Sequence, residues 1–381
     1  MGTIGGARWH SLRAIANARG AIEEVTGMPV LDDRKAAILK AIVQDYVRGG
    51  EPVGSKRLAD EWELGVSAAT VRTDMAALED AGFITHPHTS AGRIPTDKGY
   101  RYFVDSLAVG AGGAGAGTLT PEHLAALEGL LLGSVDLEDL LRRASGVLSR
   151  LTRFAALVSA PQLDRSRLRH IELVALGPTS VLAILIADTG RVEKRMLDLE
   201  TPVADYDVQR ARHAVNGAAA GLRADQAPDV ITGVAAGAPV EVRGLVEAVA
   251  EAVRHGLAGG GGGGEHVFVG GTANIAAGHF ERLEQVKQVY ETMEEQVILL
   301  QMLRDTLRSG DPAVRIGAEL ALVELAACSV VAASYEATGD AVGSVGVLGP
   351  MRMDYPRTLA AVQAVASSLE KALAELTGGN G

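Results

Sequence analysis

Cysteine is nearly absent from this sequence, since Cys328 is the single one among 381 residues. One thiol excludes an internal disulfide framework and a cysteine metal cluster, and it fits a reducing compartment. No apolar run is long enough to span a membrane, because the run at residues 181–187 has only the length of a strand. Residues 1–29 lack the apolar segment of a secretory signal. We therefore expect a cytoplasmic protein with no membrane partner.

Catalytic and phosphate-binding patterns are missing as well. No nucleophile has a paired base, and the glycine runs at residues 110–117 and 259–264 lack the P-loop pattern. His86 and His88 would share one face of a strand, but no cysteine or third histidine lies nearby to complete a metal site. The sequence therefore predicts no enzyme, no cofactor and no metal.

Positive charge is also in short supply. The formal net charge is −11, which argues against indiscriminate binding of nucleic acid by the whole molecule. Residues 32–105 carry ten Lys and Arg against twelve Asp and Glu, a net of −2. A DNA-binding surface in this region must therefore depend on an uneven distribution of charge. The cations expected around it are Lys56, Arg57, Arg72, Arg93, Lys98 and Arg101.

What is present is the order of helix caps and turns that is typical of a winged helix-turn-helix, between residues 51 and 102. The expected features are a Ser55 cap, a helix over 56–63, a turn at 64–66, a Ser67 cap, a helix over 68–81 and a Gly82 stop. A helix over 31–47 precedes them, and Thr96 is expected to cap a helix over 97–107 behind the wing.

The helix over 68–81 is the candidate reading helix, which would lie in the DNA major groove. One stripe is predicted to face a core, namely Val71, Met75 and Leu78, and the opposite side holds Ala69, Arg72, Thr73 and Ala76. Arg72 has the geometry to bind guanine bidentately, which is worth roughly 1–3 kcal/mol of discrimination. The alternative is that Arg72 pairs with Glu79 or Asp80 on a solvated face.

Residues 83–85 and 93–95 are predicted to pair as the two strands of a wing around a polar tip. The two histidines at this tip are interpreted as phosphate or sugar contacts, with a purely structural wing as the alternative. Arg93 would reach the minor groove or the backbone, and Lys98 and Arg101 suit phosphates. The predicted DNA contacts are Ser55, Lys56, Ser67, Ala69, Thr70, Arg72, Thr73, His86, His88, Thr89, Ser90, Arg93, Lys98 and Arg101.

The rest of the chain alternates between helical and strand periodicity. Helices are predicted over 121–132, 137–153, 205–222, 240–255, 281–307 and 355–376, and strands over 154–159, 169–176, 181–187, 191–199, 329–333 and 345–348. Strands early and late, with helices between them, indicate one α/β domain interrupted by an insertion. Residues 269–274 are interpreted as a turn within that insertion. In the turn at 349–355, Arg352 and Asp354 would either bind an anion or fix the turn, and we favour the second interpretation.

Two long motifs resemble the HrcA family of heat-inducible transcription repressors. The first comprises PVGS, SAATVRTDMAALEDAGFI and PHTSAGRIPTDKGYRYFVD, and the second is GSVGVLGPMRMDYPRT. The chain departs from the family at Met351, where a small hydroxyl residue is expected, and at Thr73, where an amide residue is usual. The resemblance implies an α+β chain, with an N-terminal winged helix-turn-helix followed by a GAF-like α/β domain that carries an inserted dimerisation domain.

The expected boundaries are an N-terminal extension (1–29, with Met28 as a candidate start), a winged-helix domain (30–108), a Gly/Ala linker (109–119), a GAF-like domain (120–203 and 308–378) and the insertion (204–307). The resemblance further implies a homodimer that represses chaperone operons at an inverted repeat of the CIRCE type, with the chaperonin GroEL as modulator. We expect the middle region, not the winged helix, to form the dimer. The alternative function is a regulator that senses a small molecule through the GAF-like domain.

Overall fold

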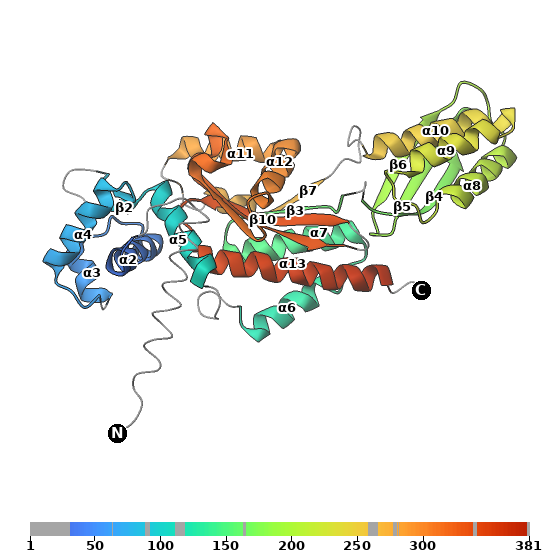
Figure 1. Cartoon of the computed structure of the whole chain (residues 1–381). Coiled ribbons are helices and arrows are strands. Elements are labelled where there is room, and N and C mark those ends of the chain that lie inside the picture. Colours follow the sequence, from blue (N-terminus) through green and yellow to red (C-terminus); the bar gives the residue numbers. More distant parts are fainter. Residues whose placement is uncertain are drawn as a thin grey trace.

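The computed structural model describes residues 31–62, 64–87, 92–110, 119–162, 165–257, 266–276, 280, 282–337 and 341–378. Three units follow one another in space (Figure 1). We name them the N-terminal unit (31–110), the central unit (119–162 with 266–378) and the distal unit (165–257). Helices and antiparallel sheets occur together, which confirms the expected α+β class. The extension at 1–29 and most of the glycine-rich stretch at 110–117 lie outside the described residues.

Within its described residues, the N-terminal unit holds four helices and a two-stranded sheet: α2 (Asp33–Gly49), α3 (Ser55–Glu61), α4 (Ala68–Asp80), β1 (Ile84–Thr85), β2 (Ile94–Pro95) and α5 (Asp97–Gly110). Local side-chain chemistry sets the helix starts. The Ser67 hydroxyl accepts a hydrogen bond of 3.3 Å from the Thr70 N–H, and the Thr96 hydroxyl accepts one of 3.2 Å from the Gly99 N–H. Ile84 and Thr85 pair with Pro95 and Ile94 as predicted.

One predicted cap of this unit is wrong. Ser55 is the first residue of α3, and Gly54 occupies the cap position without a side-chain hydrogen bond. The end of α4 agrees with the sequence, because Gly82 has a φ of 76°, a backbone conformation that glycine adopts without strain.

The central unit is built on an antiparallel sheet with the strand order β7-β3-β10-β9-β8. Its strands are β3 (Ala155–Ser159), β7 (Val267–Gly270), β8 (Ala313–Ile316), β9 (Cys328–Glu336) and β10 (Val342–Pro350). Its helices are α6 (Pro121–Leu131), α7 (Leu137–Thr152), α11 (Leu283–Glu294), α12 (Gln296–Leu307) and α13 (Tyr355–Gly378), with short 3-10 turns η1 (Thr272–Ala276), η2 (Gly317–Leu320) and η3 (Val323–Leu325). Helices α7 and α13 cover one face of the sheet, and α11 and α12 cover the other (Figure 1).

Three details of the central unit differ from the sequence prediction. The single helix expected over 281–307 is broken at Glu295, whose φ and ψ of −91° and 85° are not helical. Strands β7 and β8 were not predicted, because runs of four residues carry little periodicity. The turn expected at 269–274 is right for residues 271–274 and wrong for Val269 and Gly270, which belong to β7 and pair with β3 inside the central sheet.

The distal unit combines a sheet in the order β4-β5-β6 with three helices. Its elements are β4 (Leu168–Ala175), β5 (Ser180–Ala187), β6 (Val192–Asp198), α8 (Asp205–Ala219), α9 (Ala227–Gly237) and α10 (Val240–Leu257). One face of the sheet packs on the helices and forms a hydrophobic core separate from that of the central unit. The structure thus groups the strands at 168–198, expected in the GAF-like domain, with α8–α10. It groups α11 and α12, expected in the insertion, with the central sheet.

The N-terminal and central units share one continuous hydrophobic core. A single cluster of buried residues runs from α2 and α4 through Phe103 on α5 to Tyr355 and Leu369 on α13. The ring centroids of Tyr100 and Tyr355 lie 5.9 Å apart across the boundary. The two units are therefore docked on each other. Among the described residues, no helix is long and apolar enough to cross a membrane.

Candidate DNA-binding surface

Helix α4 presents one buried and one exposed face. Val71, Asp74, Met75 and Leu78 are buried, and Asp74 accepts hydrogen bonds of 2.6 and 3.1 Å from Arg34 of α2. This ion pair and the apolar stripe fix the rotation of α4 against α2. The predicted opposite face is exposed to solvent: Ala69, Arg72, Thr73 and Ala76.

Arg72 lies on that exposed face and makes no ion pair or hydrogen bond within the described part of the chain. The alternative partner Glu79 is occupied, because it binds His86 and Arg93. The interpretation of Arg72 as one half of a solvated ion pair is therefore wrong. Its guanidinium keeps all its donors, as a side chain that contacts a base or a phosphate requires.

The neighbouring predicted contacts lie around the start of α3 and α4. Lys56 is exposed and, in the regions that the structure describes, has no ion-pair partner. The Ser67 and Thr70 hydroxyls lie 3.1 Å apart, and the Thr73 hydroxyl donates to the Ala69 carbonyl of its own helix over 3.2 Å. These hydroxyl groups are exposed or half-buried at the same end of α4 as Arg72.

A three-residue charge cluster lies at the base of the β1–β2 ribbon. The Glu79 carboxylate binds the His86 ring nitrogen Nδ1 and accepts a hydrogen bond of 2.8 Å from Arg93 Nε. The hydrogen bond with His86, followed by that with Arg93, lowers the pKa of Glu79 below its ordinary value. Since the carboxylate counters the charge of Arg93, this predicted contact is less available to DNA than Arg72.

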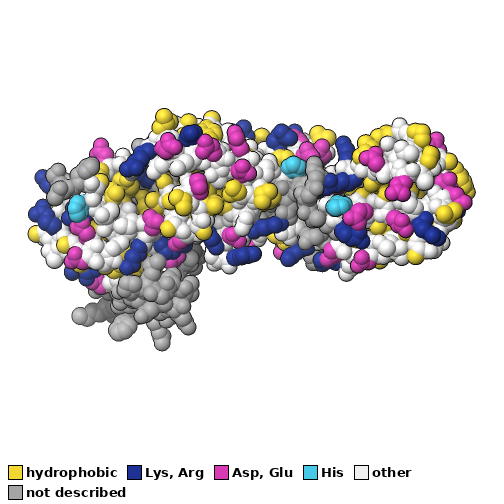
Figure 2. Space-filling model, turned by 90° about the horizontal axis from the view of Figure 1, so that it is seen from above, with side chains coloured by type: hydrophobic (Ala, Val, Ile, Leu, Met, Phe, Trp, Pro, Cys, Tyr) yellow, Lys and Arg dark blue, Asp and Glu magenta, His cyan; other side chains and the backbone are white. Residues whose placement is uncertain are grey.

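The other predicted cations have structural roles. Lys98 donates to the carbonyl of Ala81 at the end of α4 over 2.8 Å, with its Nζ 4.5 Å from the centroid of the Phe83 ring. Arg57 pairs with Asp45 at 3.0 Å and with Glu61 at 3.4 Å. Lysines and arginines alternate with acids on the face that Figure 2 shows, which leaves no broad field of one sign.

Arg101 does not belong to this surface, and its prediction as a phosphate contact is wrong, because the side chain is paired and largely shielded from solvent. Its guanidinium points into the central unit and binds Glu319. Glu319 lies 218 positions away in sequence, so local sequence patterns could not predict this pair. His88, Thr89 and Ser90 lie outside the described residues.

For the turn at 349–355, before α13, the sequence predicts that Arg352 and Asp354 either bind an anion or hold the turn in its conformation. Instead, the Arg352 guanidinium lies 6.0 Å from the centroid of the Tyr46 ring on α2. The Asp354 carboxylate accepts a hydrogen bond of 3.2 Å from the Arg357 N–H at the start of α13. The two side chains therefore serve different elements, and Arg352 contacts the N-terminal unit.

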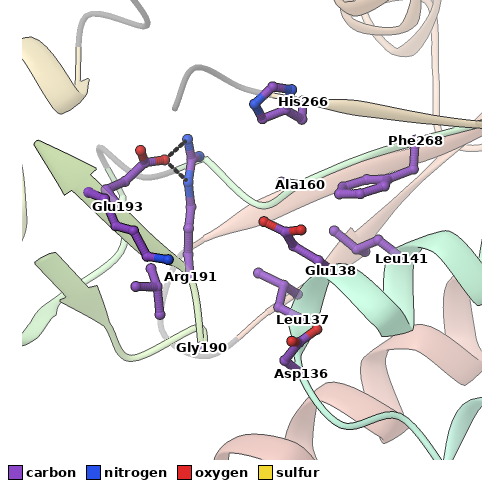
Figure 3. A pocket seen from close by; sticks show the side chains of 12 residues that line it. Asp136, Leu137, Glu138, Leu141, Ala160, Gly190, Arg191, Glu193, His266 and Phe268 are labelled. Carbon is purple, nitrogen blue, oxygen red and sulfur yellow. Dashed lines mark hydrogen bonds and ion pairs between the residues drawn. The ribbon is translucent and has the colours of Figure 1, made fainter. Parts of the chain in front are cut away.

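A cavity of about 390 Å³ lies where the distal unit meets the central unit (Figure 3). Its lining includes Glu138, Phe268 and the buried pair Arg191–Glu193. Arg191 donates to Glu193 over 2.9 and 2.7 Å and to the Pro161 carbonyl over 3.1 Å. Because these buried groups satisfy one another, the cavity gives no specific support to a ligand-sensing function. In the described ranges, no cluster of His, Cys, Asp or Glu is arranged to hold a metal ion.

Comparison with known proteins shows to which family the chain belongs. The model of the HrcA protein C terminal domain matches residues 138–359. The heat-inducible transcription repressor HrcA of Acidothermus cellulolyticus is 46% identical over 349 residues, which cover 91% of this chain and 100% of that protein. The chain belongs to the HrcA family.

Other HrcA proteins have a similar degree of identity. The heat-inducible transcription repressor HrcA of Streptomyces avermitilis is 44% identical over 91% of this chain and 100% of its own length. That of Thermobifida fusca is 44% identical over 91% of this chain and 98% of its own length. A crystal structure described as a hypothetical protein has a TM-score of 0.61 and 21% identity, and it covers 91% of this chain and 99% of that chain. This likeness shows that the two chains share a fold over nearly their whole lengths.

Proposed function

We propose that this HrcA-family chain is a cytoplasmic, homodimeric repressor of heat-shock genes that binds an inverted-repeat operator in double-stranded DNA. The relatives named heat-inducible transcription repressor support the repressor function. The observation that carries DNA binding is the exposed face of α4, on which Arg72 has no competing acid among the described residues. An arginine without an ion-pair partner, on the exposed face of a helix and near its capped N-terminus, suits direct recognition of bases in the major groove.

The N-terminal unit supports a winged helix-turn-helix as the DNA-binding module. In this proposal α3 and α4 are the helix-turn-helix and β1–β2 is the base of the wing. Gly65, with a φ of 66°, lies in the turn between the two helices. Ser55, Lys56, Ser67, Ala69, Thr70, Arg72 and Thr73 then form the candidate DNA contacts on the helices. The central unit, with an antiparallel sheet between two helical layers, is proposed to be the GAF-like domain.

The distal unit supplies a surface for the homodimer. On the sheet face away from its helices, Leu182, Ile184 and Ile186 form the central column. Val174, Val192 and Met196 flank this column with exposed fractions of 39%, 47% and 55%. An exposed apolar sheet face of this kind marks an interaction site. We name it the outer sheet face.

The charges on the outer sheet face suit a second copy of the same chain. Glu172 on β4 and Lys194 on β6 both pair in register with Ile184, one on each side. Glu172 already binds Arg212 of α8 at 2.6 Å and His170 at 3.1 Å. A two-fold axis running along β5 would set this paired carboxylate of one copy opposite Lys194 of the partner subunit. Self-complementarity about a two-fold axis is what an isologous dimer requires. We propose that the outer sheet face is the dimer interface, which makes the distal unit the dimerisation domain.

Family membership extends the proposal to the regulatory circuit. HrcA resemblance implies an operator of the CIRCE type ahead of chaperone operons and a chaperonin, GroEL, that supports the active repressor. Titration of the chaperonin by misfolded protein would then release repression.

A gel-shift titration at fixed salt tests the DNA-binding proposal. The purified chain should bind an inverted-repeat probe at least about 10³-fold more tightly than a probe in which each half of the repeat is scrambled. Equal affinity for the two probes would contradict sequence-specific recognition. A second titration, with GroEL added to the chain before the DNA, should raise the fraction of repressor that binds the repeat. No change on adding chaperonin would contradict the GroEL part of the proposal alone.

A further inference from the structure

The N-terminal and central units are joined by polar contacts at two places, besides the shared core. One place lies between α5 and the β8–η2 turn, and the other lies between the end of α2 and the turn before α13. Neither place includes a residue that the proposed function assigns to DNA. We name these two groups of contacts the α5 contact and the α2 contact.

Arg101 is the centre of the α5 contact. Its Nε donates to Glu319 over 2.8 Å, and its second terminal nitrogen binds the other Glu319 oxygen and the Val314 carbonyl, the latter over 2.7 Å. The remaining terminal nitrogen donates to Asp105 over 3.3 Å. Only 18% of the Arg101 side chain is exposed. A bidentate, charge-assisted pair with restricted solvent access holds a fixed geometry, unlike a mobile surface ion pair.

The backbone of the β8–η2 turn fits closely against the same helix. The Ala318 N–H donates to the Asp97 carboxylate over 3.4 Å. Gly317, with a φ of 54°, leaves space for that carboxylate, because a Cβ atom at this position would collide with it. The first turn of α5 is therefore held at Asp97 while Arg101 holds its second turn.

Arg352 is the centre of the α2 contact. Its guanidinium lies over the Tyr46 ring and against Gly50, the left-handed residue that ends α2. A Cβ at Gly50 would lie 2.5 Å from the Arg352 guanidinium, so the absence of a side chain there admits the arginine. Arg352 comes from the turn that follows β10, and thus from the end of the central strand of the sheet.

These contacts act on the orientation of α4, because α4 is itself locked to α2 through the Arg34–Asp74 pair. We propose that Arg101 and Arg352 are positioning residues for operator recognition. They hold each N-terminal unit at one angle to the central unit, so that the two α4 helices of a dimer meet both half-sites at one spacing. The inference rests on the proposed function, since it requires a dimer and a two-half-site operator.

The physical reason is the effective concentration of the second α4 helix. Once one half-site is bound, the second binding event is intramolecular, and a rigid link at the correct spacing makes it most favourable. If the contact between the N-terminal and central units loosens, the second α4 helix samples many orientations. Affinity for an operator with the correct spacing then falls, and affinity for an operator with an incorrect spacing falls less or not at all. Contacts with a single half-site are unchanged, because neither arginine touches DNA.

The test compares Arg101→Ala and Arg352→Ala with the wild-type chain on three probes. These are the inverted repeat, the same repeat with about five base pairs added between the halves (roughly half a DNA turn), and a single half-site. Arg357→Ala is the matched control, because Arg357 is an exposed arginine on the first turn of α13 whose side chain makes no ion pair within the described ranges. It removes the same charge from the same region without touching the N-terminal unit.

For the wild-type chain and Arg357→Ala we expect affinity for the lengthened repeat to be about 100-fold below that for the natural repeat. For Arg101→Ala and Arg352→Ala this ratio should fall to about 10-fold or less, with unchanged affinity for the half-site. Thermal unfolding identifies a variant that fails to fold. In that case Arg101→Lys, which keeps the charge but loses the bidentate fork, replaces it. The same decrease in the affinity ratio between the two repeats is expected.

Two results would overturn the proposal. If both arginine variants keep the wild-type ratio between the two repeats, the contacts do not set the spacing. If half-site affinity falls as much as operator affinity in Arg101→Ala, Arg101 acts at the DNA itself. A wild-type chain that does not prefer the repeat over the half-site would instead contradict the proposed function, which is a distinguishable failure.

Discussion

Glu79, in the last turn of α4, binds Arg93, the residue before β2, through an ion pair of 2.8 Å. The same carboxylate binds His86, the residue after β1. One acid thus ties α4 to both sides of the ribbon and counters the positive charge there. This arrangement stabilises the ribbon but opposes nonspecific attraction to phosphates.

Replacing Glu79 by Gln should therefore raise affinity for operator and scrambled DNA alike, since Arg93 becomes available to a phosphate. One added phosphate contact should steepen the slope of log affinity against log salt by about 0.9. Salt titrations of both probes measure this. Asp80→Asn is the control, because Asp80 is an exposed acid without an ion pair in the described part of the chain. Equal effects of the two variants would show that only net charge matters.

Arg72→Ala should weaken operator binding much more than binding to scrambled DNA, because base contacts specify and phosphate contacts position. The expected loss on the operator corresponds to about 1–3 kcal/mol, or roughly 5-fold to 150-fold. Arg72→Lys keeps the charge but not the bidentate fork, so it should recover affinity for scrambled DNA and not for the operator. Equal factors of loss on both probes would make Arg72 a phosphate contact.

Ile184→Lys should convert the dimer into a monomer, because it places two cations at the centre of the outer sheet face. Sedimentation measures the change, and half-site binding should remain. Val230→Lys is the matched control: Val230 is 38% exposed on α9, in the helical layer of the same unit. A fragment of residues 165–257 should also dimerise, since it has its own core. A dimeric Ile184→Lys variant would locate the interface elsewhere.

The protein should lose stability at alkaline pH. Burial raises the pKa of Cys328 from its ordinary 9.0 to about 12, and it also raises the pKa values of Tyr335 and Tyr355. The folded state binds these protons more tightly than the unfolded state, so stability is fully present below about pH 9 and falls as pH rises from there toward 12. Urea midpoints across this range measure the loss. Cys328→Ala should reduce the fall between about pH 9 and 10, and identical profiles would contradict the assignment.

Most of the N-terminal unit could be predicted because its signals are local. The Ser67 and Thr96 caps and the Gly82 stop each act within a few residues, and all three are present in the structure. The exposed and buried faces of α4 also follow from its periodicity alone. Ser55 failed as a cap because Gly54 already has the extended backbone of a cap residue, with a ψ of 148°.

Local signals could not predict how the strands after residue 154 are divided between the central sheet and the distal sheet. Strand β5 alternates buried and half-buried residues, a pattern that any half-covered sheet would show, so it does not say which sheet the strand joins. The same limit applies to charge: the sequence predicts Arg101 near α4, but its partner Glu319 follows 218 residues later. Which cations are free is a property of the tertiary fold.

The shared core of the N-terminal and central units has a consequence for heating. Because the buried cluster is continuous across both, they should melt as one cooperative block, and the N-terminal unit cannot unfold while the central unit stays intact. The distal unit, with a separate core, forms a second block with its own melting temperature. In the proposed dimer, a chain heated between the two temperatures would release its operator while still attached to its partner, provided that the distal block is the more stable one.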